Sequence, residues 1–469
     1  MCSIIVSSRE INELNYVNYF TQFRGPDSTN VYKKNGITFI HNLLSMTGSF
    51  TTQPFLKDDI VCLYNGEVYN YKEFGDYKSD GECLIDLYHE YGCDFVKKLD
   101  GEFAIFLMDF SKNITLVSTD VFGKKPLWYS TADGEFGVAS YKSALERIGF
   151  ENIQRVEANT YLINFKPVGE LYSFDLKQHK NTYDDWVSAF QRSIRKRYHD
   201  STQKVFIGLS SGYDSGAIAC ELNNQQVDYY AYSSIGNDNP DIIKSRHSLM
   251  PENSKGFIFE ATAQDYRKAH KAIEEKVEEF TYEIYSSSSD YNQFGLSLKD
   301  DNGANGLSHI CSLAKKDARK IYLSGQGADE IFSDYGFQGV KKFAHSNFGG
   351  LYPDDLATIF PWASFFGSTQ YSYLMKEEYI SGAYGLEGRY PFLDVDVVQE
   401  FLWLNPALKN ANYKSVLHHY LELNNYPFEA GQKTGFSLPT KGQFVKDGTI
   451  LGDLKQSFKK KVKGLIGKN

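Results

Sequence analysis

A cysteine stands second in the chain, in the sequence MCSIIV, directly after the initiator methionine. A thiol is a nucleophile only as its thiolate, so it needs a neighbouring base to take its proton. An α-amino group, with a pKa near ~7.7 to 8.0, can serve as that base without a histidine. If Met1 is removed, Cys2 carries both groups. The sequence thus predicts a self-activated nucleophile, while the alternative is a cysteine that merely opens a buried strand.

A second stretch, IGLSSGYDSGAIA at 207–219, combines small residues with an aspartate where an expected strand runs into a helix. Backbone N–H groups at such a helix start suit phosphate, and an aspartate can hold Mg²⁺ against it. The stretch is not a Walker loop, because no G-K-[ST] follows. It predicts a phosphate loop, and the alternative is an ordinary strand-to-helix corner.

Two kinds of element must position these residues. Residues 1–165 are rich in short apolar runs typical of strands, with one clear helix at 81–92. From 183 onward, after a linker at 168–182, a helix at 183–198 is followed by strands that alternate with helices. This alternation predicts a doubly wound parallel sheet, whose ligands bind beyond the carboxyl ends of its strands. The expected strands lie at 204–210, 229–235, 256–261 and 320–325.

The composition narrows the function classes. A chain of 469 residues is too long for one core, so we expect two domains. The net charge of −9 argues against a nucleic-acid binder and favours small-molecule substrates. Six cysteines without a CxxC pair, and no secretory signal, indicate a reducing, cytoplasmic setting. The uncharged stretch 356–375 contains Pro361 and Gly367 and is expected to be buried in the protein, with no membrane partner.

Five further motifs follow Cys2 in order: FRGPDSTN (23–30), YNGEVYNY (64–71), KSDGE (78–82), LDGEFAIFLMDF (99–110) and DVFGKKPLWY (120–129). Together they resemble the glutaminase half of the class II glutamine amidotransferases, an Ntn-hydrolase family with an αββα sandwich. The resemblance implies that Cys2 attacks the glutamine side-chain amide and releases ammonia through a γ-glutamyl thioester. It also implies that Asn65 and the Gly66 N–H form the oxyanion hole, and that Glu67 and Asp80 help to bind glutamine, Asp80 through its ammonium.

One motif departs from the family. Where the family reads HERLSI or HRRLSI, this chain reads HNLLSM at 41–46, so Leu43 replaces the arginine that grips the glutamine carboxylate. Leucine cannot imitate a bidentate guanidinium. Either another cation such as Arg24 takes over, or glutamine binds weakly and free ammonia is the practical nitrogen donor.

The second half shows its own resemblance. LSGQGADEIFSDYG (323–336), YGLEGRYPFLD (384–394) and KTGFSLP (433–439) are similar to segments of the asparagine synthetase ligase domain, whose PP-loop matches 207–219. The resemblance implies a nucleotide site, with Mg²⁺ held by Asp214 and Asp329. Gln326 occupies the position of a family glutamate that is a candidate base, and 283–309 does not match the segment that frames aspartate. The residues implied to bind ATP are Leu209, Ser210, Gly212, Asp214, Ser215, Ser324, Gly325 and Lys433.

The two resemblances together predict a glutaminase domain at 1–165 and an ATP pyrophosphatase-type ligase domain at 183–469. We expect an enzyme that activates a carboxylate, aspartate first, as an acyl-adenylate and amidates it with ammonia from glutamine. ATP and Mg²⁺ are the expected cofactors, and a homodimer is a family expectation. Two alternatives stay open: a different carboxylate or cyclising acceptor, and a scaffold that has lost catalysis.

Overall fold

The computed structural model describes residues 1–235, 238–284 and 295–431. Its N-terminal part is a sandwich of two six-stranded antiparallel sheets. The first sheet has the order β10-β8-β9-β1-β3-β2, and the second has the order β12-β11-β7-β6-β5-β4. The strands are β1 (Ser3–Ser7), β2 (Ser28–Lys34), β3 (Ile37–Leu43), β4 (Phe55–Lys57), β5 (Ile60–Val68), β6 (Gly101–Asp109), β7 (Ile114–Thr119), β8 (Trp128–Ala132), β9 (Glu135–Ala139), β10 (Gln154–Arg155), β11 (Thr160–Ile163) and β12 (Lys166–Glu170).

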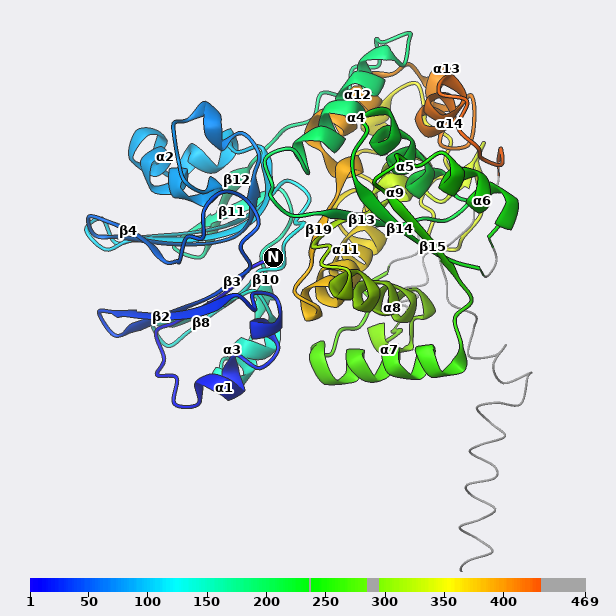
Figure 1. The fold of residues 1–469 in the computed structure, drawn as a ribbon. Coiled ribbons are helices and arrows are strands. Elements are labelled where there is room, and N and C mark those ends of the chain that lie inside the picture. Colours follow the sequence, from blue (N-terminus) through cyan, green and yellow to red (C-terminus); the bar gives the residue numbers. More distant parts are fainter. Residues whose placement is uncertain (236–237, 285–294, 432–469) are drawn as a thin grey trace, which may run out of the picture.

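Helices cover both outer faces of this sandwich (Figure 1). The helices α1 (Leu14–Val17) and α3 (Lys142–Ile148) pack on the first sheet, and α2 (Cys83–Tyr91) packs on the second. Strand β5 shows how the sequence builds the layers. Its alternate residues Cys62 and Tyr64 face α2, whereas Val61 and Leu63 face the core between the sheets. The result is the four-layered αββα arrangement that the resemblance implied.

The C-terminal part is built on a parallel sheet of the order β15-β14-β13-β16-β19. Helix α5 packs on one face of the sheet with α4 and α14, and α8 packs on the other with α7 and α11. The strands are β13 (Val205–Gly208), β14 (Tyr229–Ser234), β15 (Lys255–Phe259), β16 (Ile321–Leu323) and β19 (Glu387–Arg389), with a small hairpin of β17 (Gly336–Phe337) and β18 (Val340–Lys341). The helices are α4 (Asp184–Lys196), α5 (Tyr213–Asn224), α6 (Pro240–Ser248), α7 (Ala263–Lys276), α8 (Asn302–Lys316), α9 (Ala328–Phe332), α10 (Ala363–Phe366), α11 (Ser368–Ala383), α12 (Val395–Trp403), α13 (Pro406–Lys409) and α14 (Ser415–Leu423).

Most sequence-based expectations for the elements are confirmed. The predicted helices at 81–92 and 183–198 are α2 and α4, and the four predicted strands are β13, β14, β15 and β16. The expected linker 168–182 is wrong at its start, because β12 pairs with β11 as far as Glu170. The uncharged stretch 356–375 forms α10 and the first half of α11. No helix in the described part of the chain is long and apolar enough to cross a membrane.

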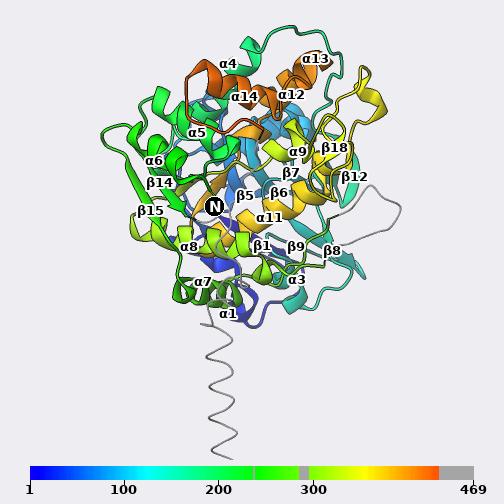
Figure 2. The same ribbon diagram turned by 90° about the vertical axis from the view of Figure 1, so that its right-hand side faces the viewer.

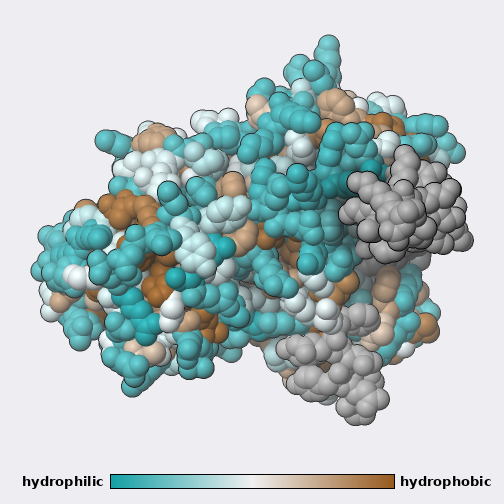
Figure 3. Space-filling model, turned by 90° about the horizontal axis from the view of Figure 1, so that it is seen from below, coloured by the Kyte–Doolittle hydropathy of each residue, from teal (hydrophilic) through white to brown (hydrophobic). Residues whose placement is uncertain are grey.

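The sandwich and the parallel-sheet unit lie side by side, with the N-terminus between them near β19 (Figure 1). In Figure 2 the parallel-sheet unit stands in front of the sandwich. Buried ion pairs join the two: Arg24 with Glu378 at 2.8 Å, Lys125 with the same carboxylate at 2.9 Å, and Arg197 with Glu102 at 2.9 Å. Seen from below, most of the outer surface is hydrophilic (Figure 3). The three ion pairs thus bury charged side chains in the interface between the two units.

Two candidate active sites

Cys2 lies just before β1 and borders a small cavity. Its Sγ accepts the Leu44 N–H at 3.4 Å and donates to the Leu44 carbonyl at 3.7 Å. The cavity is also lined by Gly66, Glu67 and Asp80, so the fold brings together four of the residues predicted from the first set of motifs. The remaining lining is mainly hydroxyl-bearing or apolar: Leu43, Leu44, Ser45, Met46, Thr47, Ser49, Thr51, Gln53, Phe55, Tyr64, Ser79 and Gly81.

The end of β5 shapes the expected oxyanion hole. Gly66 has a φ of +143°, and a Cβ there would lie 1.9 Å from the Glu102 carbonyl oxygen on β6, so only glycine fits. Asn65 next to it is fully buried, and neither polar atom of its side chain has a hydrogen-bond partner among the described residues. A buried amide without a partner is costly unless a ligand completes it. This supports Asn65 as a donor to substrate, which stays a prediction.

The two acidic residues of this cavity are held in different ways. Asp80 Oδ2 accepts the Tyr64 hydroxyl at 2.6 Å and the Val68 N–H at 2.9 Å. Burial raises the pKa of Asp80 to about 6, and these two bonds oppose the shift. Glu67 accepts the Thr47 hydroxyl at 2.6 Å and pairs with Arg389 of β19 at 3.0 Å. The ion pair of Glu67 with Arg389 thus links the cavity of Cys2 directly to the parallel sheet.

The part of the cavity lining that the structure describes offers no cation for a glutamine carboxylate. Leu43 is part of the wall, and no lysine, arginine or histidine belongs to the lining that the described residues form. Arg24, named above as one possible replacement for the missing cation, does not line the cavity. Its Nε donates to the Cys2 carbonyl at 3.1 Å, and its other two nitrogens bind Glu378, the Tyr141 hydroxyl and the Met1 sulfur. Arg24 is therefore committed to the interface between the two units.

The N-terminus itself is buried. The α-amino group of Met1 lies 3.0 Å from Glu387 Oε2 on β19, and no part of Met1 is exposed. Burial lowers the pKa of this amine and raises the pKa of the Cys2 thiol to about 12. While Met1 is attached, the thiol is protonated and its own residue has no α-amine. The activation of Cys2 as a nucleophile stays a prediction, and it would require the removal of Met1.

The second site lies at the carboxyl end of β13, where the loop into α5 forms a tight turn. Ser210 N–H donates to the Ser215 hydroxyl at 3.0 Å, and Gly212 N–H donates to the Ser210 hydroxyl at 3.2 Å. Arg246 of α6 is fully buried beneath the loop and donates to the carbonyls of Ser210 and Gly212, at 2.5 and 2.9 Å. The N–H groups of Ser210, Ser211 and Gly212 are bound within the site, so the N–H groups at the start of α5 are the ones that suit a phosphate.

Ser211 and Gly216 stand where the PP-loop pattern has glycine and serine, and the structure explains both departures. A Cβ on Gly216 would lie 2.4 Å from an Arg246 nitrogen, so glycine makes room for the guanidinium. Ser211 donates from its N–H and its hydroxyl to Asp238, at 2.7 and 2.8 Å. Both unusual residues therefore serve contacts that fix the loop.

Two carboxylates converge beside the loop. Lys414 Nζ lies 2.5 Å from Asp214 Oδ1 and 2.9 Å from Asp329 Oδ1. These two carboxylates raise the pKa of the Lys414 ammonium. The position of Nζ shows that both oxygens can reach one cation between them. Two carboxylates next to a phosphate loop suit Mg²⁺, which takes its other ligands from water and substrate phosphate.

The cavity at this site holds most of the residues predicted for the nucleotide. Leu209 and Ser324 lie behind its wall: Leu209 N–H donates to Tyr232 on β14, and Ser324 N–H donates to the Arg389 carbonyl on β19. Lys433 lies outside the described residues. The predicted residues that line the cavity are Ser210, Gly212, Asp214, Ser215, Gly325 and Asp329.

Comparisons with known proteins agree with this two-site arrangement. Residues 1–174 match the family model of the glutamine amidotransferase domain, and residues 185–364 match that of asparagine synthase. The chain joins a glutamine amidotransferase domain to an asparagine synthase domain. A putative glutamine-hydrolysing asparagine synthetase 1 of Methanocaldococcus jannaschii is 26% identical over 95% of this chain and 81% of its own length. Asparagine synthetase 1 of Arabidopsis thaliana is 26% identical over 82% of this chain and 66% of its own.

Among solved structures, the allosteric regulatory enzyme of purine biosynthesis matches over 55% of this chain and 80% of its own. Its TM-score is 0.31 and its sequence identity is 14%.

Three residues of the second site were missed by sequence reasoning. Lys414, Arg246 and Glu377 stand in no motif, and each reaches the ligase cavity or its loop from a distant helix or helix start.

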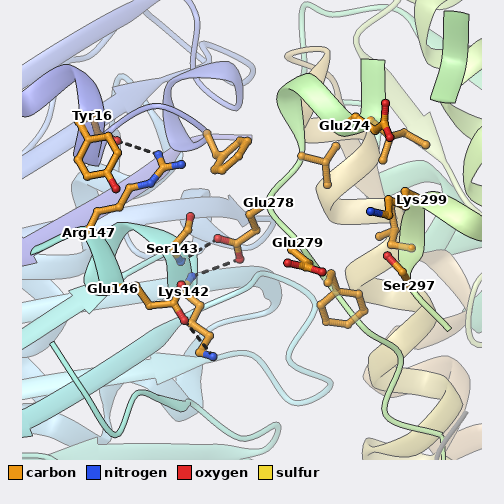
Figure 4. A pocket seen from close by; sticks show the side chains of 15 residues that line it. Tyr16, Lys142, Ser143, Glu146, Arg147, Glu274, Glu278, Glu279, Ser297 and Lys299 are labelled. Atoms are coloured by element: carbon orange, nitrogen blue, oxygen red, sulfur yellow. Dashed lines mark hydrogen bonds and ion pairs between the residues drawn. The ribbon is translucent and has the colours of Figure 1, made fainter. Parts of the chain in front are cut away.

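A third and larger cavity, about 750 Å³, lies in the cleft between the two units (Figure 4). There Glu278 accepts the Ser143 N–H at 2.8 Å and the Lys142 N–H at 3.3 Å, and so caps α3 of the sandwich from the opposite unit.

Proposed function

We propose that the protein is a glutamine-dependent, ATP-consuming amidotransferase that makes asparagine from aspartate. One observation carries the proposal: a single chain holds a cavity around Cys2 and a phosphate loop flanked by convergent carboxylates, each with its matching family model. The names of its relatives support the same reaction class.

In the first half-reaction Cys2, freed of Met1, attacks the amide carbon of glutamine. Its new α-amine takes the thiol proton and passes it to the departing ammonia. Asn65 and the Gly66 N–H bind the oxygen on which charge develops, and such a donor contributes about 10²- to 10³-fold in rate. Asp80 holds the substrate ammonium. With no cation for the carboxylate in the described lining, we expect weak glutamine binding and efficient use of free ammonia.

In the second half-reaction the N–H groups at the start of α5 and the hydroxyls of the loop bind the ATP phosphates. Asp214 and Asp329 would hold Mg²⁺, which when bound neutralises charge on the phosphates. Lys414 lies between these carboxylates and would add a cation next to the leaving pyrophosphate. The acceptor carboxylate then attacks the α-phosphorus, and ammonia converts the acyl-adenylate into the amide.

A different carboxylate acceptor is the second candidate. The wall beyond the loop carries four aromatic rings together with Lys376, whose Nζ lies 3.7 Å from Asp301 at the start of α8. Such a wall suits an acceptor larger and less polar than aspartate. The four rings belong to Tyr322, Tyr335, Phe343 and Tyr373.

Pyrophosphate release with ATP, ammonium chloride and a panel of carboxylic acids separates these candidates. Aspartate-dependent release supports asparagine synthesis, and dependence on another acid names the true acceptor. If no acid of the panel gives pyrophosphate release, a scaffold without catalysis is favoured. Glutamate release from glutamine by the wild type but not by Cys2→Ala tests the first site, and equal release by both would refute it.

A further inference from the structure

Two polar atoms in the ligase cavity lack partners. Oε2 of Glu377, on α11, and Nε2 of Gln326, in the loop after β16, are buried and have no hydrogen-bond partner among the described residues. Both side chains line the cavity that the phosphate loop borders. Glu377 is 9% exposed. One atom is an acceptor and the other a donor, so a bound group that presents an N–H and an oxygen would satisfy both.

The surroundings of Glu377 suit a carboxylate that exchanges a proton near neutral pH. Burial, with a smaller contribution from the carboxylates of Glu378 on α11 and Glu330 on α9, raises its pKa to about 7. The Ser324 hydroxyl and the Lys376 ammonium oppose the shift. Glu377 also interacts electrostatically with Cys311 on α8, Tyr322 on β16, Tyr282 and Tyr390.

The family glutamate that is a candidate base is replaced here by Gln326, which cannot accept a proton usefully. Glu377 lines the same cavity from α11. Its carboxylate is hydrogen-bonded to the side chain of Ser324, two residues before Gln326. The carboxylate lost from the loop is therefore present on α11.

We propose that Glu377 is the general base of amide formation and that Gln326 holds the acyl oxygen. The lone pair of the attacking nitrogen bonds to the acyl carbon while Gln326 Nε2 donates to the carbonyl oxygen. The bond from that carbon to the phosphate oxygen breaks, and AMP leaves with the electron pair. The surplus proton passes from nitrogen to Glu377 Oε2. This inference rests on the proposed function, because it needs an acyl-adenylate in the cavity.

The test uses the full-length protein with ATP, ammonium chloride and aspartate, or the acid that the panel names. Two rates are measured: acid-dependent ATP–pyrophosphate exchange, which reports adenylate formation, and amide formation. Glu377→Gln should keep exchange within about threefold and lose at least 100-fold in amide formation, since a general base contributes about 10²- to 10⁴-fold. Its pH profile should lose the fall in amide formation below pH 7, and Glu377→Asp should recover part of the rate.

Glu221→Gln is the matched control, because Glu221 is a buried glutamate of α5 that does not line the cavity. Amide formation by Glu377→Gln within threefold of the wild type would overturn the inference. So would an equal loss of both rates with a raised KM for the acid, which would make Glu377 a ligand of the acceptor. No pyrophosphate from the wild type with any acid would refute the proposed function itself.

Discussion

Leu43 shows how one side chain can set the nitrogen donor. It borders the cavity of Cys2 and Asp80 at the position of the family arginine. We predict that Leu43→Arg lowers the KM for glutamine about 10- to 100-fold, because a hydrogen bond to a charged group contributes about 1.5 to 3 kcal/mol. Glutamate release measures the effect, and ammonia-dependent synthesis should not change. Leu43→Met, an unbranched side chain without charge, is the control, and an equal gain in that variant would contradict a carboxylate clamp.

We predict that Asp80 sets a pH limit for the proposed glutaminase reaction. Its pKa is raised to about 6 by burial, and only its ionised form attracts the glutamine ammonium. Lowering the pH through 6 protonates the carboxyl, so kcat/KM for glutamine should fall about tenfold per pH unit below that value. Asp80→Asn should show a low kcat/KM without this inflection. An unchanged profile in the variant would assign the limit to another group.

At the scale of elements, the turn from β13 into α5 depends on the space left by Gly216. A serine there, as in the family pattern, would force the Arg246 guanidinium away from the loop carbonyls. We predict that Gly216→Ser raises the KM for ATP about tenfold in pyrophosphate release and destabilises the fold by about 1 to 3 kcal/mol. Gly169→Ser on β12 is the control, because a Cβ there meets nothing within 4 Å. Equal KM values for the two variants would show that the loop tolerates the shift.

The same turn shows what the sequence could and could not predict. Asp214 follows a strand within its own motif, and strand-to-helix periodicity fixes its place at the end of the parallel sheet. Lys414 stands directly before α14, 200 positions after Asp214, and only tertiary packing brings its ammonium to Asp214. The sequence could not exclude Arg24 as the cation for glutamine for the same reason. No local sequence pattern reveals that Glu378, 354 positions away, binds its guanidinium. Motifs predict the residues of one loop, whereas partners from distant elements need the folded chain.

For the molecule as a whole, the interface between the two units is held by buried charge. Met1, Arg24, Lys125 and Glu67 of the sandwich each pair with a residue of α11 or β19. Buried pairs contribute little net stability, yet removing one partner costs about 3 to 5 kcal/mol because the other charge is left unpaired. Such pairs favour a single docked arrangement. They place the Cys2 cavity directly against the edge strand of the ligase sheet.

This arrangement makes the order of maturation testable. Met1 is inaccessible once the units dock, so its removal must come before docking. We predict that a variant with a specific protease site ending directly before Cys2 has no glutaminase activity when uncut, since its cysteine lacks an α-amine. It should also resist the protease when folded. Cutting under mild urea, followed by refolding, should restore glutamate release. Intact mass identifies the N-terminal residue, and glutaminase activity in the uncut protein would show that another group deprotonates Cys2.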